Sequence, residues 1–589
     1  MDGQRRPELS CARSLFFGVV QDDPVFPFPD ALDAEAKDTL ALLLEPLDRF
    51  FETRVDSRKI DHEARIPPDL LQELKNMGLF GLQIPQELGG LGLSNTAYAR
   101  LFETIAAGNA SIAVMLGAHQ SIGLKGILLF GTEAQKHQYL PKLASGEWVA
   151  AFCLTEPTSG SDAASIRTRA EPSQDNAHFV LNGGKIWITN GGMADVMTVF
   201  AQTPVADEHG DVRDRITAFL VERSFGGVVS GKEEDKLGIK GSSTTAVYFE
   251  NCKVPAQNVL GEVGGGFKVA MTVLNNGRFG LAAGSVGGMK ALIHAAAQHA
   301  DTRKQFGRSL REFGLIKEKF ARMSMAAYAS ESMTYMTCGL MDRDRGAGDY
   351  GVEAAMCKVF ASESLWYVAN EALQVMGGLG YMKEYPFERV LRDARINLIF
   401  EGTNEILRLF VALSGLQAPG QHLRELAHAI KDPLQNYGML FGELAQRVKQ
   451  RIEGEKVERA HPRVRTSATQ IENDTVQFGR AVDALLRHHG KGILEQQLVL
   501  ERVADIAIDL YAMLAVVSRA STALETKHPS SEHEARLCTS FCAEADRRIR
   551  RCLRAIELGS DKNGDVELEA IADAVFERGG FVPPHLLGR

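Results

Sequence analysis

Cysteine is scarce in this chain of 589 residues, which contains eight. No two cysteines have the Cys-x-x-Cys spacing that is typical of zinc and redox sites. Cys538 and Cys542 are four residues apart and would share one face of a helix, where packing explains them. The sequence therefore predicts no metal site and no disulfide framework, and it favours a reducing compartment such as the cytosol or the mitochondrial matrix.

An excess of positive charge is also missing. The 66 Lys and Arg residues are outnumbered by 75 Asp and Glu residues, which gives a net charge of −9. A protein that binds nucleic acids in general presents a basic field, so no nucleic-acid partner is expected. The longest uncharged stretch, 104–124, includes His119, Gln120 and three glycines. It predicts buried helices rather than a lipid-facing span.

The first residues give a mixed signal about targeting. Arg5, Arg6 and Arg13 fit the remnant of a processed targeting sequence, whereas Asp2 and Glu8 are residues that a transit peptide avoids.

The composition is typical of a large globular protein, with 45% hydrophobic and 24% charged residues and a length that suggests about four structural units. Helical periodicity and short β-branched runs alternate along the chain, which predicts an α+β multidomain protein that is mostly α. The predicted parts are an N-terminal segment (1–31), an N-terminal helical domain (32–150), a β domain (151–261), a helix bundle (262–415) and a C-terminal helical domain (416–589).

Local signals add two expectations. Asn182-Gly183 lies between two strand-like runs and predicts a hairpin turn. Asn95 precedes a helical run and is a candidate N-cap.

Two loops at the ends of predicted strands carry small polar residues. Residues 153–162, CLTEPTSGSD, would expose backbone N–H groups to a polar ligand. Residues 187–192, WITNGG, would let an indole cover a planar aromatic cofactor. An ordinary turn and a core tryptophan are the alternatives.

A glycine cluster follows a predicted helix at 374–381, QVMGGLGY. Glycines there allow another backbone or a pyrophosphate to come close. The cluster is not the dinucleotide-binding fingerprint, because no strand precedes it and no helix is expected directly after it. A plain helix C-cap is the alternative.

Glu401 follows the apolar run 398–400 and precedes Gly402. A carboxylate in such surroundings is partly desolvated, which suits a base that abstracts a proton. The alternative is a surface acid at a helix N-terminus.

These four motifs, in this order and spacing, resemble the acyl-CoA dehydrogenases. The resemblance covers residues 45–415, with the family's signature patterns at 153–165 and 374–393. It implies the acyl-CoA dehydrogenase fold, in which an N-terminal helical domain, a central β domain and a four-helix bundle bind FAD. The segments 495–521 and 576–588 resemble the branch with an extra C-terminal domain that acts on very-long-chain substrates.

The resemblance also implies the cofactor contacts. Arg303 is expected at the FAD diphosphate, because a guanidinium matches that geometry. Residues 374–378 are expected to touch the FAD of a neighbouring subunit, which implies a homodimer. The full set expected to bind FAD is Phe152, Leu154, Thr155, Ser161, Trp187, Ile188, Thr189, Arg303, Phe306, Gln374, Val375, Met376, Gly377, Gly378, Thr403, Asn404 and Glu405.

On the substrate side, the resemblance makes Glu401 the catalytic base. Some relatives carry the base at the position of Gly277, and glycine cannot accept a proton. The expected acyl-CoA contacts are Ser161, Asn275, Arg278 and Gly402.

The implied reaction is FAD-dependent dehydrogenation of long-chain or very-long-chain acyl-CoA to trans-2-enoyl-CoA, the first step of mitochondrial β-oxidation. Electrons are expected to pass to electron-transfer flavoprotein. An alternative is an assembly factor for respiratory complex I with residual activity, because the relative with that role shares stretches such as 55–61.

Two further expectations concern chain length and location. Ala113 and Gly117 lie on the helix that in relatives borders the acyl tail, and their small side chains would leave room for a long chain. Residues 447–465 carry seven Lys or Arg against three Glu, a balance of +4, and follow the apolar period of Leu440 and Leu444. This predicts peripheral binding to the inner mitochondrial membrane on its matrix side.

Overall fold

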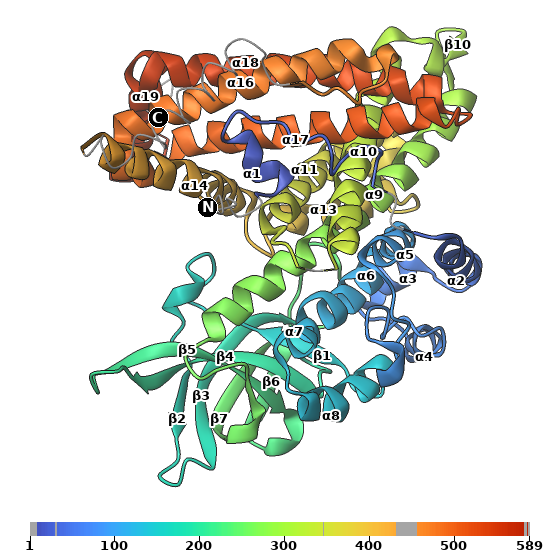
Figure 1. The fold of residues 1–589 in the computed structure, drawn as a ribbon. Helices are drawn as coiled ribbons and strands as arrows, with labels where there is room; N and C mark the ends of the chain where they lie inside the picture. Colours follow the sequence, from blue (N-terminus) through green and yellow to red (C-terminus); the bar gives the residue numbers. More distant parts are fainter. Residues whose placement is uncertain are drawn as a thin grey trace. The chain divides into compact units, whose positions relative to one another are not determined.

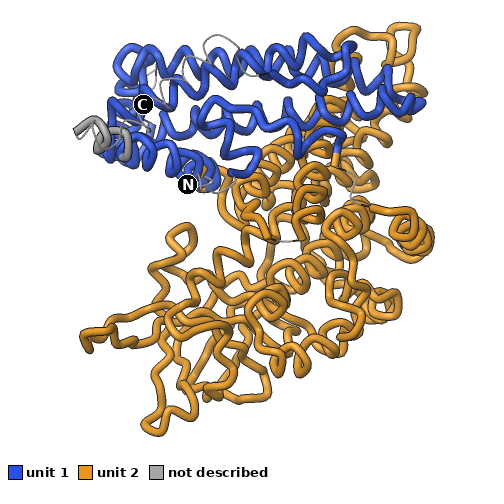
Figure 2. The backbone as a smooth tube through the Cα atoms, viewed as in Figure 1, with its two compact units in different colours: residues 1–28, 407–589 blue, residues 29–406 orange. Residues whose placement is uncertain are grey.

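The computed structural model describes residues 9–29, 32–345, 347–431, 456–581, 583 and 586, with the backbone alone for 425–431. Residues 447–455 of the predicted membrane-binding stretch therefore lie outside the described residues, whereas 456–465 are described. The chain forms two compact units, coloured separately in Figure 2. The larger unit comprises residues 29–406, and the smaller one joins residues 1–28 to 407–589.

The larger unit begins with helices, as the apolar period predicts (Figure 1). They are α2 (Ala34–Thr53), α3 (Ser57–Glu63), α4 (Pro68–Asn76), α5 (Asn95–Gly108), α6 (Ala110–Gly117), α7 (Lys125–Phe130) and α8 (Glu133–Ala144), with a π-helical turn, η2 (Ala118–Gly123), between α6 and α7.

Two details of these helices bear on the predictions. The cap predicted at Asn95 is wrong by one residue, because the Ser94 hydroxyl accepts from the Ala97 N–H at 3.2 Å. Among the described residues, one helical stretch, Ala110–Phe130, is long and apolar enough to span a membrane, and 72% of its most apolar part is buried in the fold. This supports the prediction of buried helices there.

A mixed sheet follows, which runs in the order β6-β7-β3-β2-β4-β5-β8, with β1 paired in parallel to β4. Its strands are β1 (Ala150–Cys153), β2 (Arg169–Pro172), β3 (His178–Thr189), β4 (Val196–Ala206), β5 (Val212–Glu222), β6 (Val228–Glu233), β7 (Thr244–Pro255) and β8 (Val259–Leu260).

The hairpin predicted at Asn182-Gly183 is wrong. Strand β3 runs straight through these residues, and its pairing with β7 shifts register between Leu181 and Gly183. Gly183 has φ +150°, and a Cβ there would lie 2.6 Å from the Thr168 hydroxyl. The Asn-Gly pair therefore lies at a bulge where the segment that precedes β2 approaches closely, a second role of glycine in sheets.

Long helices complete the larger unit. They are α9 (Gly266–Thr302), α10 (Gly314–Arg343), α11 (Gly351–Met376), the single turn α12 (Gly378–Tyr381), α13 (Phe387–Ala394) and the start of α14 (Asn404–Lys431), with a small hairpin, β9 (Lys304–Gln305) and β10 (Arg308–Ser309), after α9. The single turn α12 lies inside the 374–381 cluster, and the next helix, α13, begins only at Phe387. The expectation that no helix opens directly after the cluster is therefore confirmed.

Helices α9 and α11 pack closely and run parallel. A Cβ on Gly351 would lie 2.7 Å from the Asn275 amide, and one on Gly288 would lie 3.1 Å from Leu365. Both helices advance by a similar number of residues between these contacts. Their C-terminal ends, near Arg303 and Gly377, therefore lie at the same end of the bundle.

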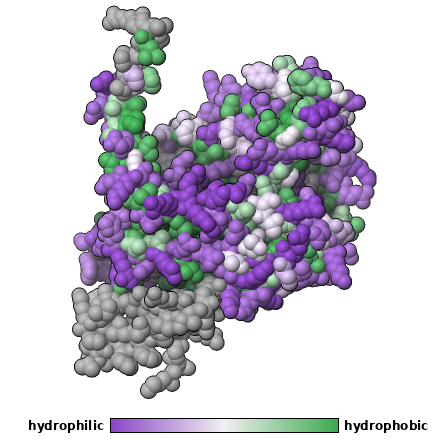
Figure 3. Space-filling model, turned by 90° about the horizontal axis from the view of Figure 1, so that it is seen from above, coloured by the Kyte–Doolittle hydropathy of each residue, from purple (hydrophilic) through white to green (hydrophobic). Residues whose placement is uncertain are grey.

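The smaller unit is helical, with α1 (Cys11–Leu15), α16 (Arg465–His489), α17 (Gln497–Glu525), α18 (Ser531–Asn563) and α19 (Asp565–Arg578). Phe16 packs edge-on against Phe478 at 5.1 Å between ring centroids, so the N-terminal segment joins the core of this unit. The face drawn in Figure 3 is mostly hydrophilic, with separate apolar patches.

Candidate active site

The first two motifs lie side by side at one end of the sheet. The N–H of Ile186 in β3 donates to the Thr155 carbonyl at 3.0 Å. Lys185 Nζ donates to the Leu154 carbonyl at 3.1 Å and forms an ion pair with Glu156 at 2.7 Å. The side chains of Lys185 and Glu156 are buried. A buried ion pair therefore fixes the start of the 153–162 loop to β3.

The Glu156 carboxylate also organises the chain that follows the loop. It accepts from the Thr168 hydroxyl at 2.6 Å, the Thr168 N–H at 3.0 Å and the Arg167 N–H at 2.6 Å. Burial raises the pKa of Glu156, but Lys185 and these donors outweigh burial and bring the pKa below its ordinary value. Glu156 is thus held ionised as a structural anion.

Trp187 presents its indole to the outside next to this loop. The side chain is 64% exposed, and the residue has φ +56° at a register irregularity of β3. A left-handed conformation and an exposed indole both cost free energy, so a planar ligand that covers the ring would offset that cost. Asn190 ties this strand end to its surroundings, because its amide donates to the carbonyls of Met115 at 3.0 Å and Ala150 at 3.3 Å.

The remaining predicted residues of these motifs differ in access. Phe152, Leu154 and Ile188 are buried, Thr155 and Thr189 are half-buried, and Ser161 is exposed. The buried side chains pack in the core next to the loop, whereas Ser161 and the two threonines remain accessible to a ligand.

Glu401 occupies a tight turn before α14. It has φ +56°, and Gly402 follows with φ +94°. Its Oε2 atom is buried and has no hydrogen-bond partner among the described residues. Burial raises the pKa of Glu401, whereas the cations Arg278 and Lys358 oppose this rise. The carboxylate is therefore desolvated and free to accept a proton.

Arg278 on α9 holds this turn from one side. Its Nε donates to the Glu401 carbonyl at 3.3 Å, and its Nη1 donates to Asn275 Oδ1 at 2.6 Å. Burial lowers the pKa of Arg278 to about 10, although Glu401 counteracts it. The predicted substrate residues Asn275 and Arg278 thus form one network with the predicted base.

Lys358 on α11 holds the turn from the other side, and the motifs gave no sign of it. The side chain is fully buried, and its Nζ donates to the Gly402 carbonyl at 2.9 Å and to Asn404 Oδ1 at 2.7 Å. The Asn404 amide donates in turn to Ser362 at 3.0 Å and Glu363 at 3.1 Å. These bonds use the Asn404 side chain within the fold, whereas Thr403 and Glu405 remain accessible.

Tyr98 on α5 is a second residue that the motifs did not reveal. Its hydroxyl is buried and, among the described residues, has no hydrogen-bond partner. Burial, and then the Glu401 carboxylate, raise the pKa of Tyr98 above its ordinary value. Buried oxygens without partners are rare in folded proteins, so those of Tyr98 and Glu401 mark a site that a polar ligand completes.

The other predicted FAD residues lie far from Glu401. Arg303 follows Arg278 by 25 positions on the continuous helix α9, a span of about 38 Å at 1.5 Å per residue. Phe306 is 94% exposed on the hairpin after α9. Gln374, Gly377 and Gly378 are exposed at the parallel end of α11, where Val375 and Met376 are buried. One chain therefore divides the predicted FAD residues into two separate groups.

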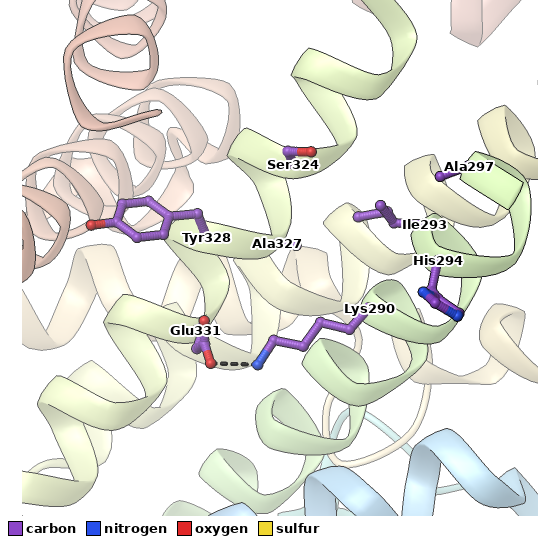
Figure 4. Close-up of a pocket in the computed structure, with 8 residues that line it drawn as sticks. All are labelled: Lys290, Ile293, His294, Ala297, Ser324, Ala327, Tyr328 and Glu331. Atoms are coloured by element: carbon purple, nitrogen blue, oxygen red, sulfur yellow. Dashed lines mark hydrogen bonds and ion pairs between the residues drawn. The ribbon is translucent and has the colours of Figure 1, made fainter. Parts of the chain in front are cut away.

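An open pocket of about 440 Å³ lies between α9 and α10, apart from these groups (Figure 4). Lys290 and Glu331 point toward each other there and form an ion pair. Lys290 is twelve residues along α9 from Arg278, about 18 Å. None of the predicted site residues lines this pocket, so it is not the predicted active site.

Comparison with known proteins identifies the family. Residues 37–147, 151–252 and 264–416 match the N-terminal, middle and C-terminal domain models of acyl-CoA dehydrogenases. Residues 462–581 match the ACAD9/ACADV C-terminal domain. The very long-chain specific acyl-CoA dehydrogenase, mitochondrial, of Bos taurus is 51% identical over 98% of this chain and 89% of its own length. The chain belongs to the acyl-CoA dehydrogenase family.

Solved structures agree. An acyl-CoA dehydrogenase from Bacillus anthracis, complexed with FAD, superposes with a TM-score of 0.79 at 33% identity, over 97% of this chain and 96% of that one. A structure described as an electron transferring flavoprotein of Acidaminococcus fermentans matches with a TM-score of 0.60 at 35% identity, over 65% of this chain and 99% of that one. This acyl-CoA dehydrogenase is thus an FAD-dependent oxidoreductase, and the exposed Trp187 ring beside the 153–162 loop suits a planar flavin.

Proposed function

We propose that this acyl-CoA dehydrogenase converts long-chain and very-long-chain acyl-CoA to trans-2-enoyl-CoA in mitochondria, as the first step of β-oxidation, and passes the electrons to electron-transfer flavoprotein. The observation that carries the reaction is a carboxylate oxygen of Glu401 that is buried, has no hydrogen-bond partner among the described residues, and lies under the influence of two cations, Arg278 and Lys358. The names of the bovine relative and of the Acidaminococcus structure support the substrate length, the compartment and the electron acceptor.

In the proposed mechanism Glu401 removes the α-proton of the acyl thioester. The residue is desolvated and its backbone is held in a left-handed turn, so Glu401 loses little conformational entropy when substrate binds. The residues around Trp187 would hold FAD, whose chemistry would be to accept the β-hydrogen as hydride. The buried hydroxyl of Tyr98 belongs to an apolar cluster that includes Phe102 and Phe279, and burial of the Glu401 carboxylate would limit the access of water to the base.

The remaining site residues are assigned as follows. Phe152, Leu154, Thr155, Ser161, Trp187, Ile188 and Thr189 would hold the flavin side of FAD, and Ser161, Asn275, Arg278 and Gly402 would lie next to the acyl-CoA. Arg278 is 6% exposed and bonded to the base turn, so we assign it to the reacting end of the substrate. Thr403, Asn404 and Glu405 complete the cofactor set, with Asn404 acting through its backbone.

The distance between the two groups of predicted FAD residues supports a homodimer. Arg303, Phe306 and residues 374–378 lie about 38 Å along the bundle from Arg278. An extended dinucleotide bound at Trp187 could meet the second group only on another chain. We therefore propose that each FAD site takes Trp187 and Glu401 from one subunit and Arg303 from its partner.

Replacement of the base tests the proposed reaction. Glu401→Gln keeps the shape and removes the basicity, so turnover of palmitoyl-CoA should fall by about 100- to 10,000-fold. The measurement is bleaching of the flavin absorbance by excess palmitoyl-CoA without an acceptor. Rapid bleaching in this variant, at parental FAD content, would show that another group takes the proton.

An assay of the parent protein tests both the proposed electron acceptor and the alternative role as an assembly factor. Palmitoyl-CoA turnover that depends on electron-transfer flavoprotein supports the proposal, whereas turnover with oxygen alone contradicts it. Absence of turnover, with recovery of respiratory complex I subunits in a pull-down, would favour the assembly-factor role instead.

We also propose peripheral membrane binding through residues 447–465. The support is the balance of +4 in this stretch and its apolar period. Cosedimentation with cardiolipin vesicles should be lost on deletion of 438–465. Unchanged cosedimentation at equal salt would contradict the assignment, and a neutral phosphatidylcholine vesicle is the control.

A further inference from the structure

The turn that carries Glu401 is built on a buried lysine to which neither the motifs nor the comparisons assign a role. Lys358 lies on α11, its side chain is fully buried, and its Nζ donates one hydrogen bond to the Gly402 carbonyl and another to the Asn404 side chain. Burial of an ammonium is unfavourable unless its N–H groups are bonded and an anion is near. Lys358 interacts with the Glu401–Gly402 turn in two ways that offset the cost of burying its ammonium group.

The first contribution is geometric. Glu401 and Gly402 both have positive φ, a conformation that an ordinary side chain adopts only when its surroundings impose it. Lys358 imposes it by holding the carbonyl immediately after Glu401, while Arg278 holds the carbonyl of Glu401 itself. The two cations thus bind consecutive peptide groups of the turn.

The second contribution is electrostatic. Burial lowers the pKa of Lys358 to about 8, and the anion that counteracts this most is Glu401, followed by Glu363 and Glu405. The lysine is therefore mostly protonated at neutral pH, beside a carboxylate whose charge burial disfavours. In the part of the chain that the structure describes, the charged groups that act on Glu401 are Arg278 from α9 and Lys358 from α11, and the Tyr98 hydroxyl from α5 is also near the carboxylate.

We propose that Lys358 is a positioning residue for the dehydrogenation: it fixes the Glu401–Gly402 turn and keeps the base ionised at the pH of the reaction. The inference rests on the proposed role of Glu401 and assigns no contact with substrate or FAD to the lysine. Lys358 contributes hydrogen bonds to the turn and a positive charge near the base. Different substitutions of Lys358 remove these two contributions separately.

The experiment compares Lys358→Met with Lys358→Gln and Lys358→Arg. Methionine removes donors and charge at similar length, glutamine keeps a donor without charge, and arginine keeps both. Ser362→Ala is the matched control, because it removes a bond to Asn404 and leaves the charge in place. FAD content and thermal unfolding establish that each variant folds.

The decisive readout is the pH profile of flavin bleaching by palmitoyl-CoA. Without the cation the carboxylate should titrate at higher pH. Lys358→Met and Lys358→Gln should therefore bleach about tenfold more slowly at low pH for every pH unit by which the profile moves, and they should recover at high pH. Lys358→Arg should retain the parental profile. Ser362→Ala should also retain it.

Two results would overturn the proposal. A rate lowered equally at every pH in the folded Met and Gln variants would mean a merely structural lysine, and parental rates and profiles would mean no role. Failure of the base assignment is distinguishable, because Glu401→Gln would then bleach rapidly whatever occupies position 358.

Discussion

The Nζ atom of Lys185 lies 2.7 Å from Oε1 of Glu156, and both side chains are buried beneath the 153–162 loop. Removing one partner of such a pair leaves an unpaired buried charge, which typically costs about 3–5 kcal/mol. Lys185→Met should therefore lower the free energy of unfolding by about that amount, as measured by denaturant titration.

The matched control is the double variant Lys185→Met with Glu156→Gln. Because neither charge is then left alone, its stability should exceed that of the single variant. A double variant less stable than both singles would show that the pair is not the source of the effect.

Trp187→Ala should weaken FAD retention with little effect on folding. The indole is 64% exposed, so its loss removes few contacts from the core, whereas a flavin would lose a stacking surface. The checks are FAD content after gel filtration and the Tm of the apoprotein. Trp148→Ala is the control, because Trp148 packs against Tyr139 and Lys142 and should lower Tm instead.

We expect acid to lower the stability of the fold because the buried ring of His119 is neutral in the folded protein. This buried ring donates from Nε2 to the carbonyl of Leu143 or Phe80, at 3.1 and 3.2 Å, and accepts from the Ala150 N–H at Nδ1. Burial lowers the pKa of His119 from 6.5 to about 4. The neutral ring is therefore favoured in the fold, and stability should decline as pH falls from 6.5 toward 4.

The integrated loss of stability at His119 is about 3 kcal/mol for a pKa lowered this far. His119→Gln should be less stable than the parent at pH 7 and should show a shallower decline between pH 6.5 and 4. Denaturant midpoints at several pH values provide the measurement. If the free energy of unfolding of His119→Gln falls with pH as steeply as that of the parent, other groups determine the acid sensitivity.

Gly117→Gln should shorten the preferred acyl chain, although by a route that the sequence did not indicate. A Cβ at Gly117 would lie 3.0 Å from the Phe102 ring, so a side chain must displace that ring. Phe102→Ala together with Gly117→Gln should restore longer substrates. The measurement is the turnover of acyl-CoA substrates from octanoyl-CoA to palmitoyl-CoA. Identical chain-length preferences in the parent, the single variant and the double variant would contradict the prediction.

The sequence predicted regular elements well where one periodicity prevailed. The strand-like runs became β1, β3, β4, β5 and β7, and the helical stretches of the bundle became α9, α10, α11 and α14. The short strands β2, β6 and β8 were not predicted, because their few residues are partly exposed and lack an apolar alternation.

The site was predictable only where a motif is continuous in sequence. Glu401 was indicated by its apolar neighbours, but Tyr98 and Lys358 lie in helices that are distant from it along the chain. A lysine inside the apolar run 354–361 was the one signal in the sequence, and it does not say which carbonyl the lysine binds. Likewise, the Asn-Gly pair at 182–183 fits a turn and a bulge equally until its strand partner is known.

The parallel course of α9 and α11 has a genetic consequence. Under the proposed dimer, a Glu401→Gln chain is defective at one end of the bundle and an Arg303→Ala chain at the other. A mixed dimer would contain one doubly damaged site and one site with both groups intact. Two alleles that are each inactive alone should therefore complement one another when expressed together, whereas two alleles with defects at the same end should not.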